Sequence, residues 1–324
     1  MPRPEKQPIN TTSPHHAGVI TCDKCRKRSV AFIRYSGAHL CKEHFSDFVE
    51  RRVKYEFRRR VHLVGGERIA IAVSGGKDST VALHLVSKIL GKRRNLDIAA
   101  ITVDEGIKEY RESSLPIVAG HCRELGIEHI VVSFKELFGT TMDEIAKTQR
   151  TISACSYCGV LRRAAMNRAA KEWNATHLAT GLNLDDSAQS ILMNISRGEV
   201  ERLARLGPHR RVQPGLVPRI QPLRTIPESE TTLYAIVNKL RYHDLECPYA
   251  PEALRNTYRS VIAELEDKYP GTRHSILKSY DELLPALDKM YPFAGLKTCK
   301  CGEPAVGTTC KACELLESLN GKAT

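Results

Sequence analysis

The cysteines near both ends of the chain have the paired spacing of tetrahedral zinc sites. The N-terminal set is Cys22-x2-Cys25-x15-Cys41-x2-His44. The C-terminal set is Cys299-x-Cys301-x8-Cys310-x2-Cys313, whose first pair is one residue tighter than usual. Two close pairs around a short loop can complete a four-ligand shell, and the metal then contributes folding energy that so small a module lacks. We expect one Zn²⁺ at each end; free structural thiols are the alternative.

A third cysteine set lies in the middle of the chain and lacks a second close pair. Cys155-x2-Cys158 is joined only by the distant Cys247, in the segment LECPYAP. Three cysteines from separate segments can hold an iron-sulfur cluster with one open iron, or run thiol-persulfide exchange. A thioredoxin-like dithiol or a buried thiol pair is the alternative. Cys158 starts a predicted helix, whose N-terminus should lower its thiol pKa, whereas Cys122 lies on an apolar helix face and is expected in the core.

The segment Ser74-Gly75-Gly76-Lys77-Asp78-Ser79 has the composition of a phosphate-binding turn. It follows a predicted buried strand and opens a predicted helix, where backbone N–H groups and the helix dipole favour an anion. Lys77 adds a positive charge, while Asp78 suits a ligand of the Mg²⁺ that accompanies ATP. The spacing fits neither the Walker pattern nor the dinucleotide-binding pattern. An ordinary strand-to-helix turn with incidental glycines is the alternative.

Two further strand ends carry polar residues that should meet this turn. Thr102-Val103-Asp104-Glu105-Gly106 ends a second predicted strand, and Thr180-Gly181-Leu182-Asn183-Leu184-Asp185-Asp186 ends a later one. Open parallel sheets bind ligands at the carboxyl ends of their strands, so we expect all three segments at one edge. For Asp185 and Asp186 a helix N-cap cluster is the alternative, because Asp favours the first helical turn.

Hydrophobic periodicity predicts the elements that position these residues. Short apolar runs indicate buried strands, and apolar residues three to four apart indicate helices. Predicted strands cover 68–75, 96–104, 129–134 and 176–181, and predicted helices cover 79–90, 113–126, 158–173 and 185–196. This alternation implies right-handed βαβ units, and therefore an α/β fold with a doubly wound parallel sheet. After a proline-rich stretch at 200–230, helices are predicted near 229–243, 251–269 and 275–290.

The length of 324 residues suffices for two domains of ordinary size. We expect six parts: a disordered tail (1–18), an N-terminal zinc module (19–47), a basic linker helix (48–66), the nucleotide-binding α/β domain (67–230), a helical region completing the site (231–293) and a C-terminal zinc module (294–324). No apolar run is long enough to span a bilayer, and the N-terminus has no secretory signal. We therefore expect a cytoplasmic protein with no membrane segment and no disulfide framework.

A net charge of +12, from 49 Lys and Arg against 37 Asp and Glu, favours polyanionic partners, nucleic acid above all. A basic proteome is the alternative. The charge is concentrated on a predicted amphipathic helix at 48–64 that could track an RNA backbone, through Arg51, Arg52, Lys54, Arg58, Arg59 and Arg60 with Tyr55 and Phe57 between them. A solvated basic helix face is the alternative there. His209-Arg210-Arg211, in the proline-rich stretch, could reach the same RNA.

The Ser74–Ser79 segment, with VDEGI and TGLNLDD at the later strand ends, resembles the PP-loop ATP pyrophosphatases. The resemblance implies an adenine nucleotide alpha-hydrolase-like fold and activation of a carbonyl oxygen by adenylation, with release of pyrophosphate. It implies ATP contacts at Ala72, Val73, Ser74, Gly75, Gly76, Lys77, Asp78, Ser79, Val103, Arg162, Gly181 and Asp186.

Together with the flanking zinc modules and the central cysteines, these motifs resemble the tRNA 2-thiouridine synthetases, TtuA-like sulfurtransferases of the PP-loop class. The resemblance covers residues 20–313 and implies ATP-dependent exchange of the uridine C2 oxygen for sulfur. It implies a [4Fe-4S] cluster on Cys155, Cys158 and Cys247, with Lys77, Asp78 and Asp186 as further catalytic residues. Relatives often have Lys at the position of Arg162 and His at that of Leu182, so the role of that helix is open.

The resemblance leaves several alternatives. CGVLRR and VDEGI favour the branch that acts on the wobble uridine, although ECPYA and PGT recur in the branch that acts on the T-loop uridine. The sulfur donor is a ubiquitin-like carrier protein or free sulfide, and the family suggests a homodimer. A PP-loop ligase with a small-molecule substrate would leave the charge and the zinc modules unexplained. A non-catalytic zinc-ribbon RNA-binding protein is disfavoured by the intact SGGKDS.

Overall fold

The computed structural model describes residues 19–61, 65–150, 152–207, 213–250, 255–292 and 295–320. The predicted disordered tail, 1–18, and His209-Arg210-Arg211 lie outside these ranges. The described residues form two compact units, one ending at Phe45 and the other beginning at Ser46.

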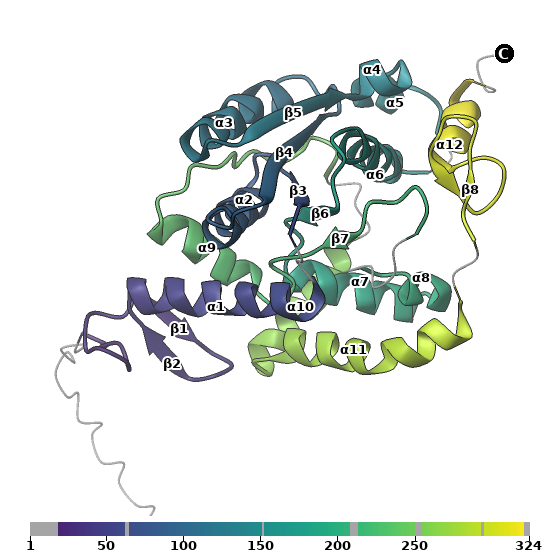
Figure 1. Ribbon diagram of the computed structural model, residues 1–324. Helices are drawn as coiled ribbons and strands as arrows, with labels where there is room; N and C mark the ends of the chain where they lie inside the picture. Colours follow the sequence, from purple (N-terminus) through teal and green to yellow (C-terminus); the bar gives the residue numbers. More distant parts are fainter. Residues whose placement is uncertain are drawn as a thin grey trace, which may run out of the picture. The chain divides into compact units, whose positions relative to one another are not determined.

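A five-stranded parallel sheet forms the centre of the larger unit (Figure 1). Its strands are β3 (Glu67–Ala72), β4 (Leu96–Asp104), β5 (Glu128–Ser133), β6 (His177–Thr180) and β7 (Arg219–Ile220). The order across the sheet is β5-β4-β3-β6-β7. Successive strands are therefore added on one side of β3 up to β5, and on the other side of β3 from β6 onward. Such a reversal of strand order opens a crevice beyond the carboxyl ends of β3 and β6. The predicted phosphate loop follows β3, and Gly181 follows β6, which places both at this crevice.

The predicted strands and the first four predicted helices of the α/β region are present, which confirms the α/β fold. The helices are α2 (Lys77–Leu90), α3 (Tyr110–Leu125), α6 (Ala154–Glu172) and α7 (Leu184–Ser196). Figure 1 shows α2 and α3 on one face of the sheet and α6 on the other. The small side chains of Ala169 and Ala170 let α6 pack closely on Ala70, Ile101 and Leu178 of the sheet.

Three helices follow the sheet, namely α9 (Glu228–Val237), α10 (Arg255–Lys268) and α11 (Thr272–Met290). The helix predicted at 229–243 ends at Val237. Lys239 has a positive φ of 55°, which breaks the helix. The chain then runs extended, and His243 forms a parallel β-bridge with Gly76. Residues 251–254 of the helix predicted at 251–269 lie outside the described ranges.

Several short elements of the larger unit carry too weak a pattern to be predicted. Strand β7 has two residues inside a proline-rich stretch, and α8 (Val200–Ala204) lies in the same stretch. Helices α4 (Phe134–Phe138) and α5 (Met142–Lys147) each begin with a capping box, which stabilises a helix too short to show periodicity. At the C-terminus, β8 (Lys297–Thr298), β9 (Pro304–Ala305) and α12 (Lys311–Asn320) form a small module.

The N-terminal unit is a hairpin of β1 (Ala31–Ile33) and β2 (Ala38–Leu40). A turn at Cys22–Cys25 precedes it, and the start of α1 (Lys42–Arg60) follows. Buried Ala31, Ile33 and Leu40 supply only a small apolar core. A module of this size usually needs a metal or disulfide to fold. Across the part of the chain that the structure describes, no helix has the length and apolar character required to cross a bilayer.

Candidate functional site

The phosphate loop leaves the end of β3 and turns directly into α2. Gly75 has a φ of +88°, and a Cβ there would come within 3.0 Å of Ser114. The Ser79 hydroxyl ties the loop together, because it accepts from the Ser74 N–H at 3.1 Å and donates to the Gly76 carbonyl at 2.8 Å. Gly76 caps α2 without a side-chain hydrogen bond, so no side chain competes for the first N–H groups of the helix. This arrangement suits a bound phosphate.

The segment after β6 packs directly on this loop. A Cβ on Gly181 would lie 2.8 Å from the backbone of Ser79, so only glycine allows the two segments to approach this closely. Val73 and Val103 are both buried at the carboxyl ends of their strands, and Ala72 ends β3. The structure therefore brings the three predicted strand-end segments to one edge of the sheet.

Helix α9 supplies polar partners for Lys77 and Asp78 that the sequence did not reveal. The Lys77 ammonium donates to Glu228 at 3.1 Å and to Thr232 at 2.9 Å. The Thr231 hydroxyl donates to Asp78 at 2.5 Å. Burial raises the pKa of the Asp78 carboxyl above its ordinary value. A buried carboxylate beside an anion-binding loop is costly without a cation, and its position fits a metal-binding role.

Asp186 caps a helix and also faces the site. Asn183 and Asp186 form a reciprocal capping box at the start of α7, so the N-cap alternative describes part of its role. Its other carboxylate oxygen accepts from Arg255 of α10 at 3.0 Å. Burial raises the pKa of Asp186, and the negative charge of Asp78 raises it further. Asp185 has different partners: it pairs with Arg273 at 2.7 Å and accepts from the Glu228 N–H at 2.7 Å.

The segment that bears Cys247 is attached to the phosphate loop. The His243 N–H donates to the Gly75 carbonyl at 2.8 Å, within the β-bridge to Gly76. Four residues later comes Cys247, and the Cys155 thiol donates to the carbonyl of Tyr249 at 3.1 Å. Cys247 packs on the same apolar cluster as the buried Cys158. These contacts link the segment that bears Cys247 to the phosphate loop, to Cys155 and to the apolar cluster that contains Cys158.

The thiol of Cys158 differs from its prediction. Burial raises its pKa, while Arg162, which donates to the Cys158 sulfur at 3.0 Å, lowers it less strongly. The predicted lowering by a helix N-terminus is wrong because α6 begins at Ala154, which places Cys158 a full turn inside the helix. Cys122, by contrast, is buried in the core as predicted.

A network of charges links Arg162 to the phosphate loop, and its pairing could not be predicted from the sequence. Glu105 is fully buried and accepts from Arg111 at 2.8 and 2.5 Å. Arg162 forms an ion pair with the other oxygen of Glu105 at 2.8 Å. Arg111 also donates to the Ser74 carbonyl at 2.7 Å. Glu105 belongs to the VDEGI segment, but its partners are separated in sequence and only the fold brings them together.

The ligand atoms of each terminal cysteine set lie close together. In the N-terminal unit, the ligand atoms of Cys22, Cys25, Cys41 and His44 lie within 4.8 Å of one another, and the same holds for Cys299, Cys301, Cys310 and Cys313. Each set could therefore hold one metal ion. Within the described residues, Cys155, Cys158 and Cys247 form no group that tight. A multi-iron cluster is wider than a single ion, so the thiolates that hold it stand further apart.

The C-terminal module packs on α6, the helix that bears Cys155 and Cys158. Cys299, Cys310 and Leu315 of the module share one apolar cluster with Tyr157 and Leu161 of α6. Polar contacts add to this interface, since the Asn167 amide donates to Glu303 at 2.9 Å. The module therefore supports the helix from the side away from the sheet.

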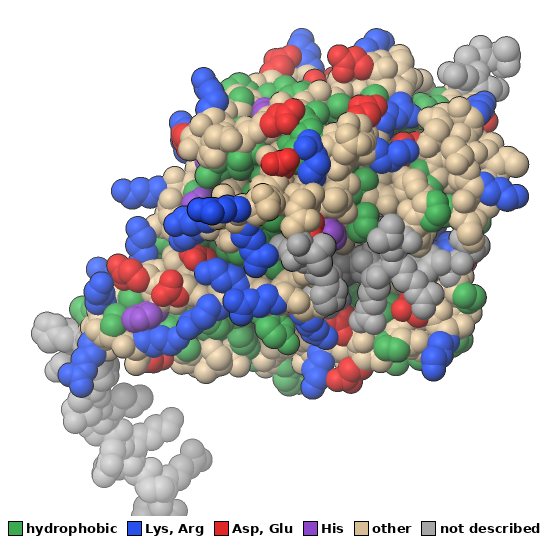
Figure 2. All heavy atoms as spheres, viewed as in Figure 1, with side chains coloured by type: hydrophobic (Ala, Val, Ile, Leu, Met, Phe, Trp, Pro, Cys, Tyr) green, Lys and Arg blue, Asp and Glu red, His purple; other side chains and the backbone are tan. Residues whose placement is uncertain are grey.

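The basic helix α1 presents only part of its predicted surface to solvent. Arg51, Lys54, Arg58 and Arg59 are exposed, and Tyr55 is 60% exposed. Arg52 instead forms an ion pair with the buried Glu230 at 2.7 Å, and Phe57 is buried. Figure 2 shows Lys and Arg side chains gathered in a band over this helix. The prediction that Arg52 and Phe57 contact RNA is therefore at odds with their packing.

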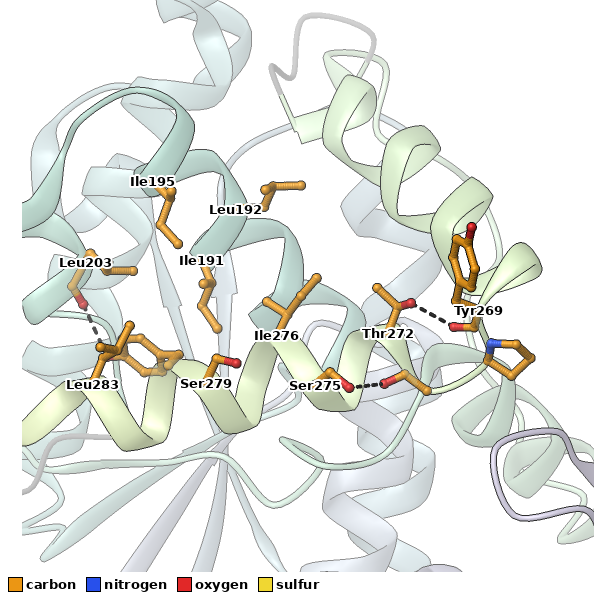
Figure 3. Close-up of a pocket in the computed structure, with 13 residues that line it drawn as sticks. Ile191, Leu192, Ile195, Leu203, Tyr269, Thr272, Ser275, Ile276, Ser279 and Leu283 are labelled. Atoms are coloured by element: carbon orange, nitrogen blue, oxygen red, sulfur yellow. Dashed lines mark hydrogen bonds between the residues drawn. The ribbon is translucent and has the colours of Figure 1, made fainter.

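A separate apolar pocket of about 410 Å³ lies between α7 and the start of α11 (Figure 3). Ile191 and Ile195 line it from α7, and Ile276 and Leu283 line it from α11. None of the predicted site residues lines this pocket. The candidate site at the β3–β6 crevice is therefore distinct from it.

Comparison with known proteins places these features in a family context. Residues 48–266 match the family described as "PP-loop domain", and residues 21–46 match "2-thiouridine synthetase TtuA, N-terminal LIM domain". The chain is similar to the tRNA 2-thiolation protein NcsA of Haloferax volcanii, with 38% identity over 93% of this chain and 99% of the relative. It is similar to the cytoplasmic tRNA 2-thiolation protein 1 of Chlamydomonas reinhardtii, with 40% identity over 87% of this chain and 79% of the relative.

A solved structure is also similar over most of its length. It is described as the U34-tRNA thiolase NcsA from Methanococcus maripaludis with its [4Fe-4S] cluster. The TM-score is 0.79 at 36% identity, covering 92% of this chain and 96% of that chain. These similarities confirm the predicted PP-loop fold and the thiolation class. The TtuA name occurs only in the match to the N-terminal module, and the two relatives and the solved structure carry other names.

Proposed function

We propose a function from one established premise: the chain belongs to the PP-loop family of tRNA 2-thiolation enzymes. In our proposal it uses ATP to replace the C2 oxygen of a tRNA uridine by sulfur, and its target is the wobble uridine. The observation that supports this proposal most strongly is the hydrogen bond from His243 to Gly75, which attaches the Cys247 segment to the phosphate loop. The choice of position is supported by the similar solved structure, which is described as acting on U34.

The nucleotide would bind along the loop between β3 and α2. Ser74, Gly75, Gly76 and the first turn of α2 would hold the phosphates through backbone N–H groups. Mg²⁺ would fit Asp78 and Asp186, because burial raises the pKa of both carboxyls and the charge of Asp78 raises the pKa of Asp186 further. The cation would offset this repulsion and neutralise phosphate charge. Arg255 now supplies part of that compensation to Asp186.

The chemistry proceeds in two displacements. The uridine C2 oxygen attacks the α-phosphate of ATP, and pyrophosphate leaves. Sulfide then adds to C2, and AMP departs with the former oxygen. Lys77, placed by Glu228 and Thr232 at the loop, would stabilise the phosphate charge that develops in the first displacement.

Cys155, Cys158 and Cys247 would hold the [4Fe-4S] cluster in this proposal. The donor set is supported by two contacts: Cys155 donates to the segment that bears Cys247, and Cys247 packs on the apolar cluster that contains Cys158. A cluster with three thiolate ligands keeps one iron open to exogenous sulfide. Arg162 contacts Cys158 and would hold that sulfur in place. Persulfide exchange on the same cysteines is the competing route.

The rest of the chain serves binding and stability in this account. Each terminal cysteine set holds one structural Zn²⁺, and the exposed basic residues of α1 bind the tRNA backbone. The six-part division of the chain predicted from its sequence belongs to the same proposal. The enzyme acts in the cytoplasm as a homodimer and receives sulfur from a ubiquitin-like carrier protein or as free sulfide.

The test uses anaerobically purified protein, ATP with Mg²⁺, sulfide and tRNA transcripts that carry uridine or cytidine at position 34. We expect 2-thiouridine by nucleoside mass spectrometry only with uridine at 34. Cys247→Ser should abolish it, whereas Cys122→Ala, which changes a cysteine outside the three sets, should not. Equal thiolation of both transcripts would contradict the wobble assignment. Thiolation by iron-free protein would contradict the role of the cluster, and AMP formation without any thiolated tRNA would favour the small-molecule ligase.

A further inference from the structure

A continuous line of polar contacts runs from the phosphate loop to the sulfur of Cys158. The Ser74 carbonyl accepts from Arg111 at 2.7 Å, and Arg111 donates twice to Glu105. Arg162 pairs with the second oxygen of Glu105 at 2.8 Å and donates to Cys158 at 3.0 Å. Each member touches the next, so the path contains no gap.

The centre of this line is rigid, whereas its end is accessible. Glu105 is 0% exposed and Arg111 is 3% exposed, so neither can exchange its partner for water. The Ser114 hydroxyl accepts a further hydrogen bond from Arg111 at 3.2 Å. The side chain of Arg162 is 42% exposed, although its Nε, which faces Glu105, is buried.

Two arginines share a single carboxylate in this arrangement. Together the two arginines carry one more positive charge than Glu105 neutralises. Nε of Arg162 faces Glu105, and its Nη2 donates to the Cys158 sulfur. The forked guanidinium reaches carboxylate and sulfur at once, which an ammonium group cannot do with the same geometry.

We propose that Glu105 is a positioning residue that couples the nucleotide site to Cys158, by holding Arg111 on the phosphate loop and Arg162 on the sulfur. Nucleotide binding to the loop then alters the free energy of a change at Cys158, and that change alters the free energy of nucleotide binding. Such coupling is reciprocal, so a change at Cys158 must alter nucleotide affinity by the same factor by which nucleotide alters the state of Cys158. The inference rests on the proposed function only for its biological purpose.

A double-mutant cycle on cluster-free protein tests the coupling without any turnover. ATP affinity is measured by calorimetry for the unchanged chain, Cys158→Ala, Glu105→Gln and the double variant. We expect Cys158→Ala to change the dissociation constant by about threefold or more in the unchanged chain and by less than about 1.5-fold beside Glu105→Gln. Glu112→Gln, on the exposed face of the same helix as Arg111, is the matched control and should leave the effect of Cys158→Ala intact.

A second measurement uses the cluster-loaded protein. Addition of ATP should shift the visible absorption or electron paramagnetic resonance signal of the cluster in the unchanged chain and in Glu112→Gln, but not in Glu105→Gln. If Glu105→Gln does not fold, Arg111→Lys takes its place, because it keeps the charge and loses the paired contact to Glu105. Equal ATP responses in the Glu105 or Arg111 variant and in the unchanged chain would overturn the inference. Absence of thiolated tRNA with intact coupling would instead overturn the proposed function alone.

Discussion

Asp78 and His274 show how the fold holds single ionisable side chains away from their preferred state. Asp78 is largely buried beside the phosphate loop, where Thr231, the more distant Lys77 and Asn183 stabilise its charge. His274 is partly buried against Arg52, and this burial together with that cation lowers its pKa to about 4. The first arrangement underlies the proposed Mg²⁺ site, whereas the second makes stability depend on pH.

Asp78→Ala should abolish ATP-dependent pyrophosphate release, because it removes a carboxylate placed to hold Mg²⁺ at the phosphates. We expect a loss of at least about 100-fold in turnover, in line with the removal of an electrostatic group from an active site. Affinity for tRNA should change by less than about twofold, since Asp78 is not one of the exposed basic residues of α1 that we propose bind the tRNA backbone. Asp97→Ala, which removes an exposed carboxylate paired with Arg68, is the control. Normal turnover in Asp78→Ala would remove its metal-binding role.

The lowered pKa of His274 makes the folded state less stable in mild acid. The unfolded chain binds a proton near the ordinary pKa of 6.5, while native His274 resists protonation down to about 4. Stability is therefore lost as the pH falls through this interval. The side chain in His274→Gln cannot titrate and can still accept from Arg52. Between pH 7.5 and 4.5 the free energy of unfolding of this variant should therefore fall by about 1–3 kcal/mol less than that of the unchanged protein. Urea unfolding followed by the fluorescence of Trp173, the single tryptophan, measures this difference. Identical losses would show that His274 already titrates freely.

At the scale of elements, α6 lies between the sheet and the C-terminal module. Its alanines pack on the sheet, while Tyr157 and Leu161 pack on the module. The helix bears Cys155, Cys158 and Arg162, so any loosening of the module reaches the sulfur site. The module has little core of its own and depends on its four cysteines.

Cys310→Ala should therefore loosen α6 more than it loosens α2. We expect hydrogen exchange of α6 amides to accelerate by about tenfold or more, since loss of one ligand weakens a structural metal site. Amides of α2, which lies on the opposite face of the sheet, should change by less than about twofold. Treatment of the unchanged protein with a strong zinc chelator should reproduce the pattern. Uniform acceleration across both helices, or none at all, would contradict this support role.

Elements and site residues differed in how far the sequence could predict them. The loop Ser74–Ser79 and the strands on either side were predictable because the information is local and contiguous. The end of α9 at Val237 was not, since the chain leaves the helix to pair with Gly76, a contact across more than 160 positions. The Glu105 network and the Arg255–Asp186 pair likewise depend on contacts that only the folded chain defines. Burial of Phe57 and pairing of Arg52 show that a basic helix pattern does not reveal which of its residues face solvent.

For the molecule as a whole, the net charge of +12 governs its encounter with RNA. Affinity for tRNA should fall steeply with added salt, because each phosphate contact releases counterions. Replacing Arg58 and Arg59 together by Ala should lower the slope of log affinity against log salt by about two. The matched control is the same double change at Lys278 and Lys289, exposed residues of α11. A flat salt response, or equal slopes in both variants, would contradict RNA binding by α1.

The central claim is that this chain thiolates the wobble uridine of tRNA with sulfur handled by Cys155, Cys158 and Cys247. Mass spectrometry of tRNA nucleosides and of mapped fragments, from cells that lack the chain, tests it most directly. The account predicts loss of 2-thiouridine at position 34 with other thiolated positions intact, and restoration by the unchanged gene but not by Cys247→Ser. Unchanged 2-thiouridine at position 34 in those cells, or full restoration by Cys247→Ser, would contradict it.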